Sequence, residues 1–307
     1  MTNWDKEIIS FHPEVELALR EGDPIVALES TVITHGLPFP ENRDLAMNME
    51  MVARKGNCTP ATIAILDGVI HVGLDEGQLE RLAHSENMRK ISGRDIAPAV
   101  ALRMSGGTTV AGSLAIAHAV GIRVFATGGI GGVHRQAPFD ISADLGELAK
   151  AQLVVVCAGA KAILDIPATL EVLETYGVPV IGYQTDEFPA FYSISSGRGV
   201  SARADSAAEV AALAHTQWEM GLGGSILVAV PPPSDVALEP EVVESAIQAA
   251  LAETQAKNIH GQGVAPFLLR RVSELTRGAS LRANLGLLLN NARVAAEIAQ
   301  IIGRQTS

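Results

Sequence analysis

Two stretches of the sequence carry the strongest evidence for the fold, SLAIAHAVGIRVFA (residues 113–126) and ADLGELAKAQLVVVC (residues 143–157). Each begins with a helical pattern and ends in a short apolar run, RVFA in the first and LVVVC in the second. Apolar runs this short, rich in valine, are typical of strands that are buried on both faces of a sheet. Two such units in succession predict parallel strands that are covered by helices.

The same alternation extends outward over most of the chain. Similar apolar runs occur at residues 24–28, 61–66, 69–72, 179–181 and 225–230. Helical patterns lie between them, at residues 41–54, 76–83, 95–103, 165–176 and 205–220. Asp67-Gly68 separates two of the runs and predicts a tight antiparallel hairpin. The sequence therefore predicts an α/β fold with a mostly parallel, mixed sheet.

The C-terminal part of the chain has a different pattern, in which helix follows helix. Residues 239–256, 266–276 and 280–302 have helical patterns, and Pro231-Pro232-Pro233 predicts a rigid connection before them. There is no internal repeat. We expect a single domain over residues 1–307, with the C-terminal helices packed on the sheet layer.

Composition narrows the classes of function. The 307 residues are 48% hydrophobic and 19% charged, with a net charge of -11, so neither disorder nor general nucleic-acid binding is expected. Residues 1–10 lack the features of a signal peptide, and no apolar stretch reaches the roughly 18 residues of a membrane span. Two cysteines without a CxxC motif predict a cytoplasmic protein without a disulfide framework.

Ligands of open α/β sheets collect at the carboxyl ends of strands, so polar residues that follow apolar runs are candidates for a site. Glu29 directly follows the run at 24–28, where partial desolvation suits a general acid; a helix cap or a structural ion pair is the alternative. Residues 127–135, TGGIGGVHR, present glycines that allow a close approach to a ligand, or only a flexible turn. Their spacing matches neither a dinucleotide motif nor a P-loop.

Asp140, Ser142 and Asp144 form a third candidate. In an extended segment they share one side, as ligands of Mg²⁺ or Mn²⁺ would. In a helix they are only an acidic first turn, which the helix dipole favours.

Two lysines complete the candidates. Lys161 follows the run at 153–157 and a small-residue turn, where burial suits a Schiff-base lysine; Asp165 would orient it or be a plain i,i+4 partner. Lys90 lies in a basic segment, residues 88–95, that leads into a helix and could hold a phosphate, or is a surface turn. Four histidines show no metal-ligand spacing: His35, His71, His84 and His118.

Taken together, these segments resemble the pseudouridine-5′-phosphate glycosidase family, also called the indigoidine synthase A-like family. The matching stretches are VALESTVITHGLPFPEN (26–42), PATIAILDGVIHVGL (60–74), KISGRD (90–95), VFATGGIGGVHR (124–135), DISADL (140–145), VVVCAGAKAILD (154–165), PVIGYQT (179–185) and APFLL (265–269), with Asn284 and Asn290-Asn291. The resemblance covers nearly the whole chain. It implies a three-layer α/β/α fold and a homotrimer.

The resemblance also implies an activity, the reversible cleavage of the C–C glycosidic bond of pseudouridine 5′-phosphate to uracil and ribose 5-phosphate. By resemblance, Lys161 is the nucleophile at C1′ and Glu29 the proton donor, while Asp140 holds Mn²⁺ largely through waters. The implied substrate-binding residues are Lys90 at the phosphate, the Val110 backbone, Ser142, Ala143, Asp144, His134 and Asn284.

Two departures from the family pattern bear on these roles. The loop at residues 134–139 is shorter than usual before Asp140, and Gly93 stands where the family often has a second arginine. Two other functions therefore stay open. One is a Schiff-base enzyme on other sugar phosphates, such as an aldolase, and the other is a non-catalytic regulator that binds a sugar phosphate or nucleotide.

Overall fold

A computed structural model describes Trp4, residues 7–85, 87–135, 137–257, Ile259 and residues 264–305. Its central sheet runs in the order β1-β4-β3-β2-β7-β10-β14-β12-β13, with β6 paired to β3 and β5 paired to β6. The strands are β1 (Ile9–Phe11), β2 (Ile25–Leu28), β3 (Thr59–Leu66), β4 (Val69–Val72), β5 (Arg89–Ile91), β6 (Gly106–Thr108), β7 (Val124–Ala126), β10 (Val154–Cys157), β12 (Val180–Tyr183), β13 (Ala202–Ala204) and β14 (Ile226–Ala229).

The pairing confirms the mostly parallel, mixed sheet. Among the described strands of the central sheet, only the pairs β3–β4 and β3–β6 are antiparallel. Asp67 and Gly68 both have positive φ, 52° and 82°, and form the tight turn between β3 and β4 that the Asp-Gly pair predicts.

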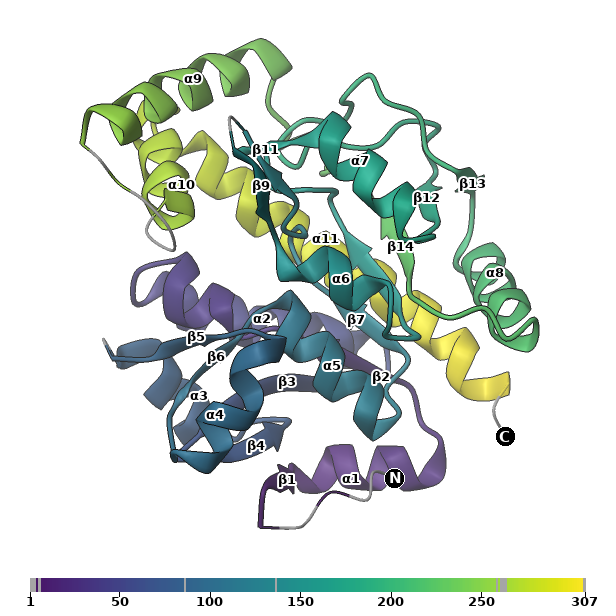
Figure 1. The fold of residues 1–307 in the computed structure, drawn as a ribbon. Helices are drawn as coiled ribbons and strands as arrows, with labels where there is room; N and C mark the ends of the chain where they lie inside the picture. Colours follow the sequence, from purple (N-terminus) through teal and green to yellow (C-terminus); the bar gives the residue numbers. More distant parts are fainter. Residues whose placement is uncertain are drawn as a thin grey trace.

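Helices cover both faces of this sheet (Figure 1). On one face, α11 packs on β2, β7 and β10 and also contacts α2 and α8, while α5 and α6 lie against each other on the opposite face. The helices are α1 (Pro13–Glu21), α2 (Glu41–Lys55), α3 (Glu76–His84), α4 (Ile96–Ala101), α5 (Val110–Val120), α6 (Ala143–Leu148), α7 (Ile166–Thr175), α8 (Ala207–Glu219), α9 (Pro240–Ala256), α10 (Val264–Leu275) and α11 (Ala279–Gln305).

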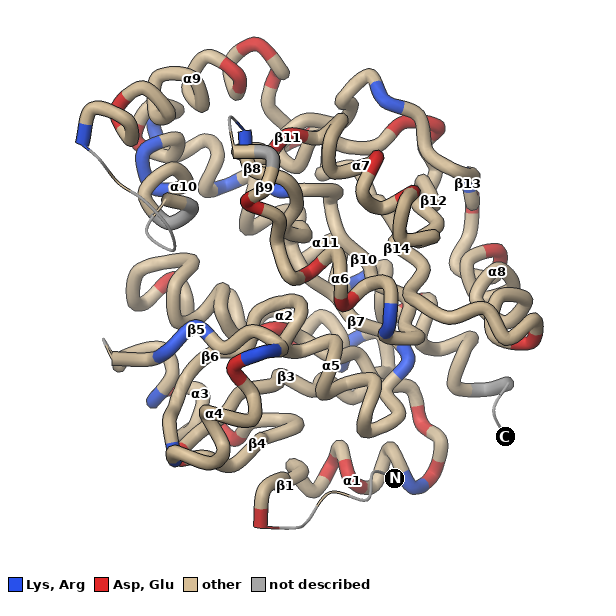
Figure 2. Tube along the Cα trace, in the orientation of Figure 1, with Lys and Arg blue, Asp and Glu red and all other residues tan. Residues whose placement is uncertain are grey.

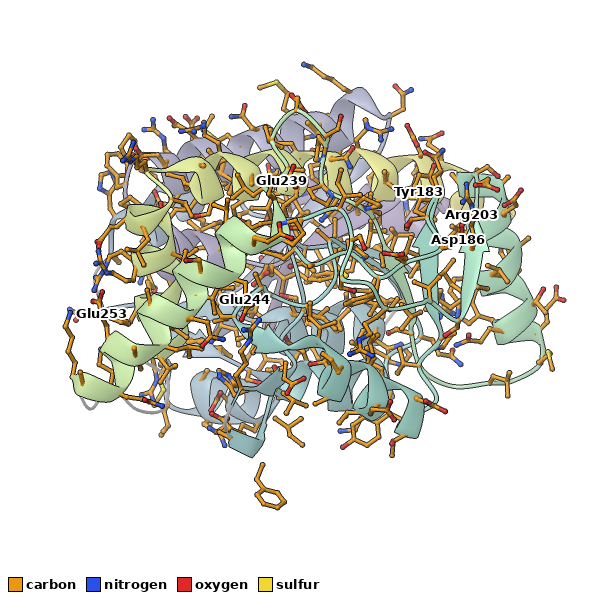
Figure 3. All side chains as sticks on the ribbon, turned by 90° about the horizontal axis from the view of Figure 1, so that it is seen from above. Tyr183, Asp186, Arg203, Glu239, Glu244 and Glu253 are labelled. Atoms are coloured by element: carbon orange, nitrogen blue, oxygen red, sulfur yellow. The ribbon has the colours of Figure 1, made fainter. Side chains whose placement is uncertain are left out.

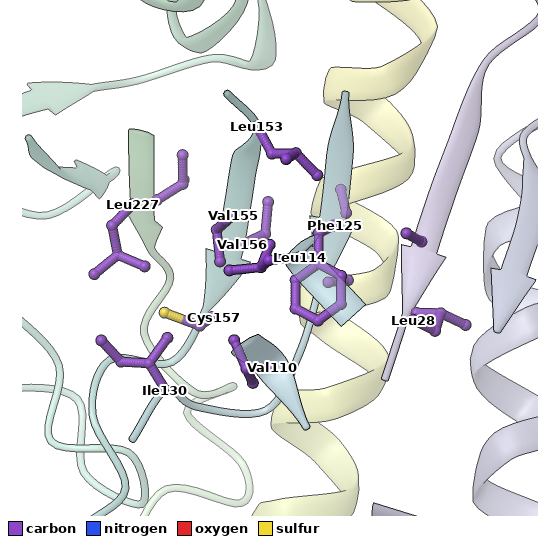
Figure 4. Close-up of a cluster of buried hydrophobic side chains, with 14 of the residues drawn as sticks. Leu28, Val110, Leu114, Phe125, Ile130, Leu153, Val155, Val156, Cys157 and Leu227 are labelled. Carbon is purple, nitrogen blue, oxygen red and sulfur yellow. The ribbon is translucent and has the colours of Figure 1, made fainter. Parts of the chain in front are cut away.

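The core lies between these layers and is built mainly from aliphatic side chains, and Figure 4 shows one cluster of it around the Phe125 ring. Phe125 on β7 is fully buried, with Val155 on β10 and Leu114 on α5 nearby. Fully burying a side chain of this size contributes about 1.5–3 kcal/mol relative to exposure. The apolar runs of β7 and β10 therefore contribute strongly to the stability of the sheet. Among the described residues, no helix combines the length and the apolar character that a membrane crossing requires.

Several elements differ from the prediction. The strands β1, β5, β6 and β13 have only three residues each, and β5 (RKI) and β6 (GGT) lack the apolar alternation that would identify them. A second, three-stranded sheet of β11 (Leu164–Asp165), β8 (Val133–His134) and β9 (Ala137–Ile141) also lies outside the prediction. The helix predicted at the start of the stretch 143–157 ends at Leu148, and residues 149–153 connect it to β10.

Candidate active site at the carboxyl edge of the sheet

Three neighbouring parallel strands end at one edge of the sheet; a polar residue directly follows two of them, and a small-residue turn follows the third. Leu28 of β2 pairs with Ala126 of β7, which pairs in turn with Val156 of β10. Glu29 and Thr127 therefore leave the sheet side by side. The turn that carries Lys161 begins one strand further on, so the topology gathers the predicted acid and the predicted nucleophile at one edge.

Glu29 is held by two hydroxyl groups in a buried position, since only 8% of the residue is exposed. The Thr127 hydroxyl donates to Glu29 Oε1 at 2.6 Å, and the Thr31 hydroxyl donates to Glu29 Oε2. These bonds fix the carboxylate at the end of β2. A helix cap or a structural ion pair would instead place a helix N-terminus or a basic side chain against the carboxylate.

The strand-end turn behind Glu29 is fixed in its own right. The Thr127 N–H donates to the Val156 carbonyl at 3.0 Å. Asn291 on α11 is fully buried and donates from Nδ2 to the carbonyls of Thr127 at 2.8 Å and Gly128 at 3.3 Å. No sequence pattern predicts a role for Thr31, Thr127 or Asn291. For Thr31 and Thr127, the available signal was a hydroxyl residue within three positions of the end of a buried strand.

Asp144 lies at the start of α6, as the helical alternative predicts. Each oxygen of its carboxylate accepts a hydrogen bond from a backbone N–H group. Its Oδ1 accepts from the Ala111 N–H at 2.9 Å, and its Oδ2 accepts from the Gly131 N–H at 2.8 Å. Only 6% of the residue is exposed. Asp144 therefore joins the glycine loop to the start of α5.

The extended arrangement of three metal ligands is wrong. The strand β9 ends at Ile141, Ser142 caps α6 by accepting from the Asp144 N–H at 3.2 Å, and Ala143 is the first helical residue. Asp140 is exposed on β9, whereas Asp144 is buried. Within the described part of the chain, no group of three His, Cys, Asp or Glu residues could hold a metal ion.

The glycine loop is tight because protein, rather than open space, surrounds it. A Cβ at Gly131 would lie 2.6 Å from Ser142 Cβ and 2.9 Å from Asp144 Oδ2. A Cβ at Gly129 would lie 2.6 Å from the Phe191 ring. The glycines therefore allow close packing of neighbouring segments at the site, which corrects the interpretation of the loop as a flexible turn.

Lys161 follows β10 on a turn that is bonded to the glycine loop. Its N–H donates to the Ile130 carbonyl at 3.1 Å, and its own carbonyl accepts from the Leu164 N–H at 2.9 Å. The residue is half-buried. Asp165 does not act as its helical partner, because Asp165 caps α7 by accepting from the Ala168 N–H at 3.0 Å.

Lys90 comes from strand β5, which joins the sheet through β6, and it pairs there with Gly107, so the interpretation as a surface turn is wrong. Desolvation lowers the pKa of Lys90, and the positive charge of Lys161 lowers it further. The carboxylates of Asp144 and Glu29 oppose both effects. Although Lys90 keeps contact with solvent, these couplings place the four charged groups in one electrostatic cluster.

Charges elsewhere are scattered along the chain, with acidic and basic positions interspersed (Figure 2). Near the cluster, His35 lies on a short π-helical turn, Val32–Gly36, and its Nδ1 is 2.7 Å from the Thr34 hydroxyl. Burial lowers the pKa of His35, and the charge of Lys90 lowers it further. The sequence offers no metal-ligand spacing for His35, and only the fold brings it beside Lys90.

The hairpin of β8 and β9 borders the site on another side. His134 is half-buried on β8 and pairs with Leu164, three residues after Lys161. Arg135 donates to the carbonyls of Leu164 at 3.1 Å and Ala162 at 3.2 Å, and forms a bidentate ion pair with Glu244 of α9, labelled in Figure 3. Gln136 and the Pro138 side chain, which belong to the shortened loop, lie outside the described residues.

Two remaining candidates come from helices. Val110 is the first residue of α5, whose N-terminus meets the site through the bond between Ala111 and Asp144. Asn284 lies on α11, one turn before Leu288 and two turns before Asn291. Those two residues contact the Thr127–Gly128 turn, so Asn284 shares the helix face that meets the strand ends.

Comparisons with known proteins agree with this architecture. A family-wide sequence profile described as "Indigoidine synthase A like protein" matches residues 14–301. A pseudouridine-5′-phosphate glycosidase of Herpetosiphon aurantiacus is 53% identical over 94% of this chain and 95% of its own. The Escherichia coli protein of the same name is 50% identical over 96% of this chain and 95% of its own.

Two solved structures share the fold. The prealnumycin C-glycosynthase AlnA, in complex with ribulose 5-phosphate, has a TM-score of 0.91 and 38% identity, and the match covers 99% of both chains. An indigoidine synthase A-like protein of Thermotoga maritima has a TM-score of 0.90 and 35% identity, with 99% of this chain and 100% of that chain covered. The chain therefore belongs to the indigoidine synthase A-like family.

Proposed function

We propose that this protein reversibly cleaves the C–C glycosidic bond of pseudouridine 5′-phosphate, giving uracil and ribose 5-phosphate. The observation that carries the proposal is the meeting of the Lys161 turn, buried Glu29 and Lys90 at one sheet edge. Relatives about half identical to this chain are named for the same substrate. AlnA, a C-glycosynthase by name, binds a pentose phosphate and has the same fold.

The chemistry explains why a lysine is needed. A C-glycoside has no leaving heteroatom on its base, so the two-carboxylate route of ordinary glycosidases does not apply. The lone pair of an amine bonded to C1′ can form an iminium as the C–C bond breaks, and the electron pair of that bond stays with the uracil carbon. C–C cleavage then becomes a retro-addition.

The proposed steps use the residues at the strand ends. The free amine of Lys161 bonds to C1′ while the C1′–O4′ bond breaks, and Glu29 donates its proton to O4′. The nitrogen now bonded to C1′ gives up a proton to water, and the uracil ring takes a proton from water at C5. The C1′–C5 bond then breaks with its electron pair staying on C5, and the nitrogen lone pair forms the C1′=N iminium. Water hydrolyses the iminium, which releases ribose 5-phosphate and the Lys161 amine.

The remaining residues are proposed to bind the substrate. Lys90 supplies positive charge for the phosphate, and the first turn of α5 brings the Val110 backbone and the positive end of the helix dipole to the site. Substrate contacts are also proposed for Ser142, Ala143 and Asp144 at the start of α6, for His134 on β8 and for Asn284 on α11.

A divalent cation, Mn²⁺ in our proposal, fits only a water-rich site here. Asp140 is exposed and free to bind an ion, whereas both oxygens of Asp144 already accept backbone N–H groups. One carboxylate with several waters is a common way to hold a small divalent ion. When bound, such an ion would stabilise negative charge on the uracil oxygens.

Two broader expectations accompany the reaction. We propose a homotrimer, which light scattering coupled to gel filtration would test. A phosphorylated nucleoside is charged and does not cross membranes unaided, so we propose that the reaction takes place in the cytoplasm.

The direct test is uracil release. Purified protein is incubated with pseudouridine 5′-phosphate plus Mn²⁺ or plus EDTA, and uracil is followed by chromatography. Uracil formation with Mn²⁺ and its loss with EDTA are expected. If a folded, metal-supplied protein releases no uracil, the proposed reaction is wrong. Borohydride trapping with a panel of sugar phosphates would then test the aldolase hypothesis.

A further inference from the structure

The carboxylate of Glu29 must exist in two protonation states if it serves the proposed reaction. It carries a proton before the sugar ring opens and has none afterwards. A hydroxyl group that only donates would stabilise the ionised state more than the protonated one. The two hydroxyls around Glu29 differ in this respect.

The Thr31 hydroxyl has two acceptors within reach. It contacts Glu29 Oε2 and lies 3.2 Å from the Thr108 carbonyl oxygen, but it has only one proton to donate. Thr31 is only 8% exposed, so water does not readily replace either partner. The position of Thr108 is fixed in turn, because its carbonyl accepts from the Ser30 N–H at 3.2 Å and its N–H donates to the Ser30 hydroxyl at 2.9 Å.

The Thr127 hydroxyl is placed differently. It donates to Glu29 Oε1 at 2.6 Å and is fully buried. Within the described part of the chain, it has no second acceptor to which its proton could turn. If it accepted a proton from Glu29, its own proton would be left without a partner, which is costly in a buried site.

We propose that Thr31 is a positioning residue that acts as a two-way hydroxyl switch for Glu29. While Glu29 is ionised, the Thr31 hydroxyl donates to it. When Glu29 is protonated, the Thr31 hydroxyl turns to the Thr108 carbonyl and accepts the carboxylic acid proton. Thr127 is a fixed donor that favours the ionised state. This inference rests on the proposed function of Glu29 as the proton donor.

The charges around Glu29 set the background against which this switch works. Lys90 of β5 interacts with Glu29 directly, and Lys161 and Asp144 interact with Lys90 from the turn after β10 and from α6. His35 on the π-helical turn lies beside Lys90. None of these groups is altered by a substitution at Thr31 or Thr127, so the threonine variants change only the hydroxyl partners of Glu29.

The test compares four variants, Thr31→Val, Thr31→Ser, Thr127→Val and Thr127→Ser, through the pH profile of kcat/KM for uracil release. Thr31→Val is expected to lower the plateau about 10–100-fold, as removal of an orienting partner does, while moving the limb that reports the Glu29 proton very little. Thr127→Val is expected to move that limb by about one pH unit toward higher pH, because the ionised state loses a donor. The serine variants keep the hydroxyl group, so each should behave nearly like the unsubstituted protein.

Two further measurements keep the test decisive. Thr254→Val, at a buried threonine of α9 whose hydroxyl bonds to the Ala250 carbonyl, controls for the loss of any buried hydroxyl. Borohydride trapping of ribose 5-phosphate on Lys161 should persist in Thr31→Val, since that step needs no proton from Glu29.

The outcomes separate the two levels of inference. If Thr31→Val moves the limb as Thr127→Val does, Thr31 is an ordinary donor and the switch is wrong. If Thr31→Val equals the unsubstituted protein, the hydroxyl has no role and the switch is also wrong. If the unsubstituted protein itself releases no uracil and traps no sugar phosphate, the proposed function has failed instead.

Discussion

The strand ends and the β8–β9 hairpin border the same site but are built in opposite ways. Glu29 and Thr127 are buried, and every polar atom of the Glu29 carboxylate has a hydroxyl partner. On the hairpin, Phe139 is 97% exposed, Ile141 is 42% exposed, and Asp140 between them is exposed as well. The buried region can hold reacting groups in fixed positions, whereas the exposed one suits a hydrated ion.

The comparison predicts that changes at the strand ends have the larger effects. Lys161→Ala is expected to reduce uracil release by about 10⁴-fold or more, because it removes the proposed nucleophile. Its melting temperature should stay near that of the unsubstituted protein, since Lys161 is only half-buried. Lys55→Ala, at an exposed lysine of α2, is the matched control for both measurements. Substantial activity in Lys161→Ala would remove the Schiff-base assignment.

Asp144→Asn tests whether buried carboxylates at the site are also structural. The amide would present an N–H group to one of the two backbone N–H donors, from Ala111 or Gly131. We expect a loss of about 1–3 kcal/mol in the free energy of unfolding, measured with urea, together with a large fall in activity. Stability equal to that of the unsubstituted protein would contradict the assigned contacts.

Because the pKa of Lys90 is lowered, we expect substrate binding to depend on pH. Its pKa lies below the ordinary value because of desolvation and the charge of Lys161. As the pH rises through this lowered pKa, the ammonium loses its proton and the KM for the phosphate substrate should rise, at a lower pH than an ordinary lysine would give.

The matching variant is Lys90→Gln, which cannot titrate. It should raise KM at neutral pH about tenfold or more, the cost of one charge-assisted hydrogen bond, and should flatten the dependence of KM on pH. A KM that still rises with pH in Lys90→Gln would assign the dependence to another group.

Asp140→Asn tests the hairpin side of the comparison. Because the side chain is exposed, the free energy of unfolding should not change measurably. Activity should fall about tenfold and require more Mn²⁺ for half of its maximum, as measured in a metal titration of uracil release. If EDTA abolishes the activity of the unsubstituted protein but the variant keeps the same Mn²⁺ requirement, the ion binds elsewhere.

Gly93→Arg is expected to have the smallest effect. A Cβ at Gly93 would lie 3.6 Å from Glu147 Oε2, an ordinary contact, so a side chain fits there. Burial raises the pKa of Glu147, and a guanidinium beside it would favour the ionised carboxylate. The variant should fold normally and lower the substrate KM only a few-fold. A destabilised protein would show that the local backbone requires glycine.

The difference between the two regions also explains where prediction from the amino-acid sequence succeeds. Glu29 and Lys161 follow fully apolar runs, so the rule that ligands collect at strand ends is enough to locate them. Asp140 and Asp144 lie between a short strand and a short helix, where two interpretations of the same spacing compete. The helical interpretation of Asp144 is correct because Ser142 caps α6, a local contact that residue spacing does not specify.

Lys90, Thr31 and Asn291 show where such prediction falls short. Lys90 lies on a three-residue strand without an apolar pattern, so its segment resembles a turn that leads into a helix. Asn291 bonds to the Thr127 carbonyl across 164 residues of sequence. Contacts over such distances depend on the packing of α11 against the sheet, which hydrophobic periodicity indicates only in outline.

Local patterns along the chain were sufficient to predict the alternation of buried strands and helices, the parallel sheet, and the strand ends from which Glu29 and Lys161 emerge. They were sufficient because burial of apolar side chains drives folding and depends little on exact partners. Which polar atoms meet depends on the packed fold: the two hydroxyls on Glu29, the two N–H groups on Asp144, and Lys90 beside Lys161. Hydrogen bonds require a specific distance and angle between their partners, and these are set when the packed layers come together.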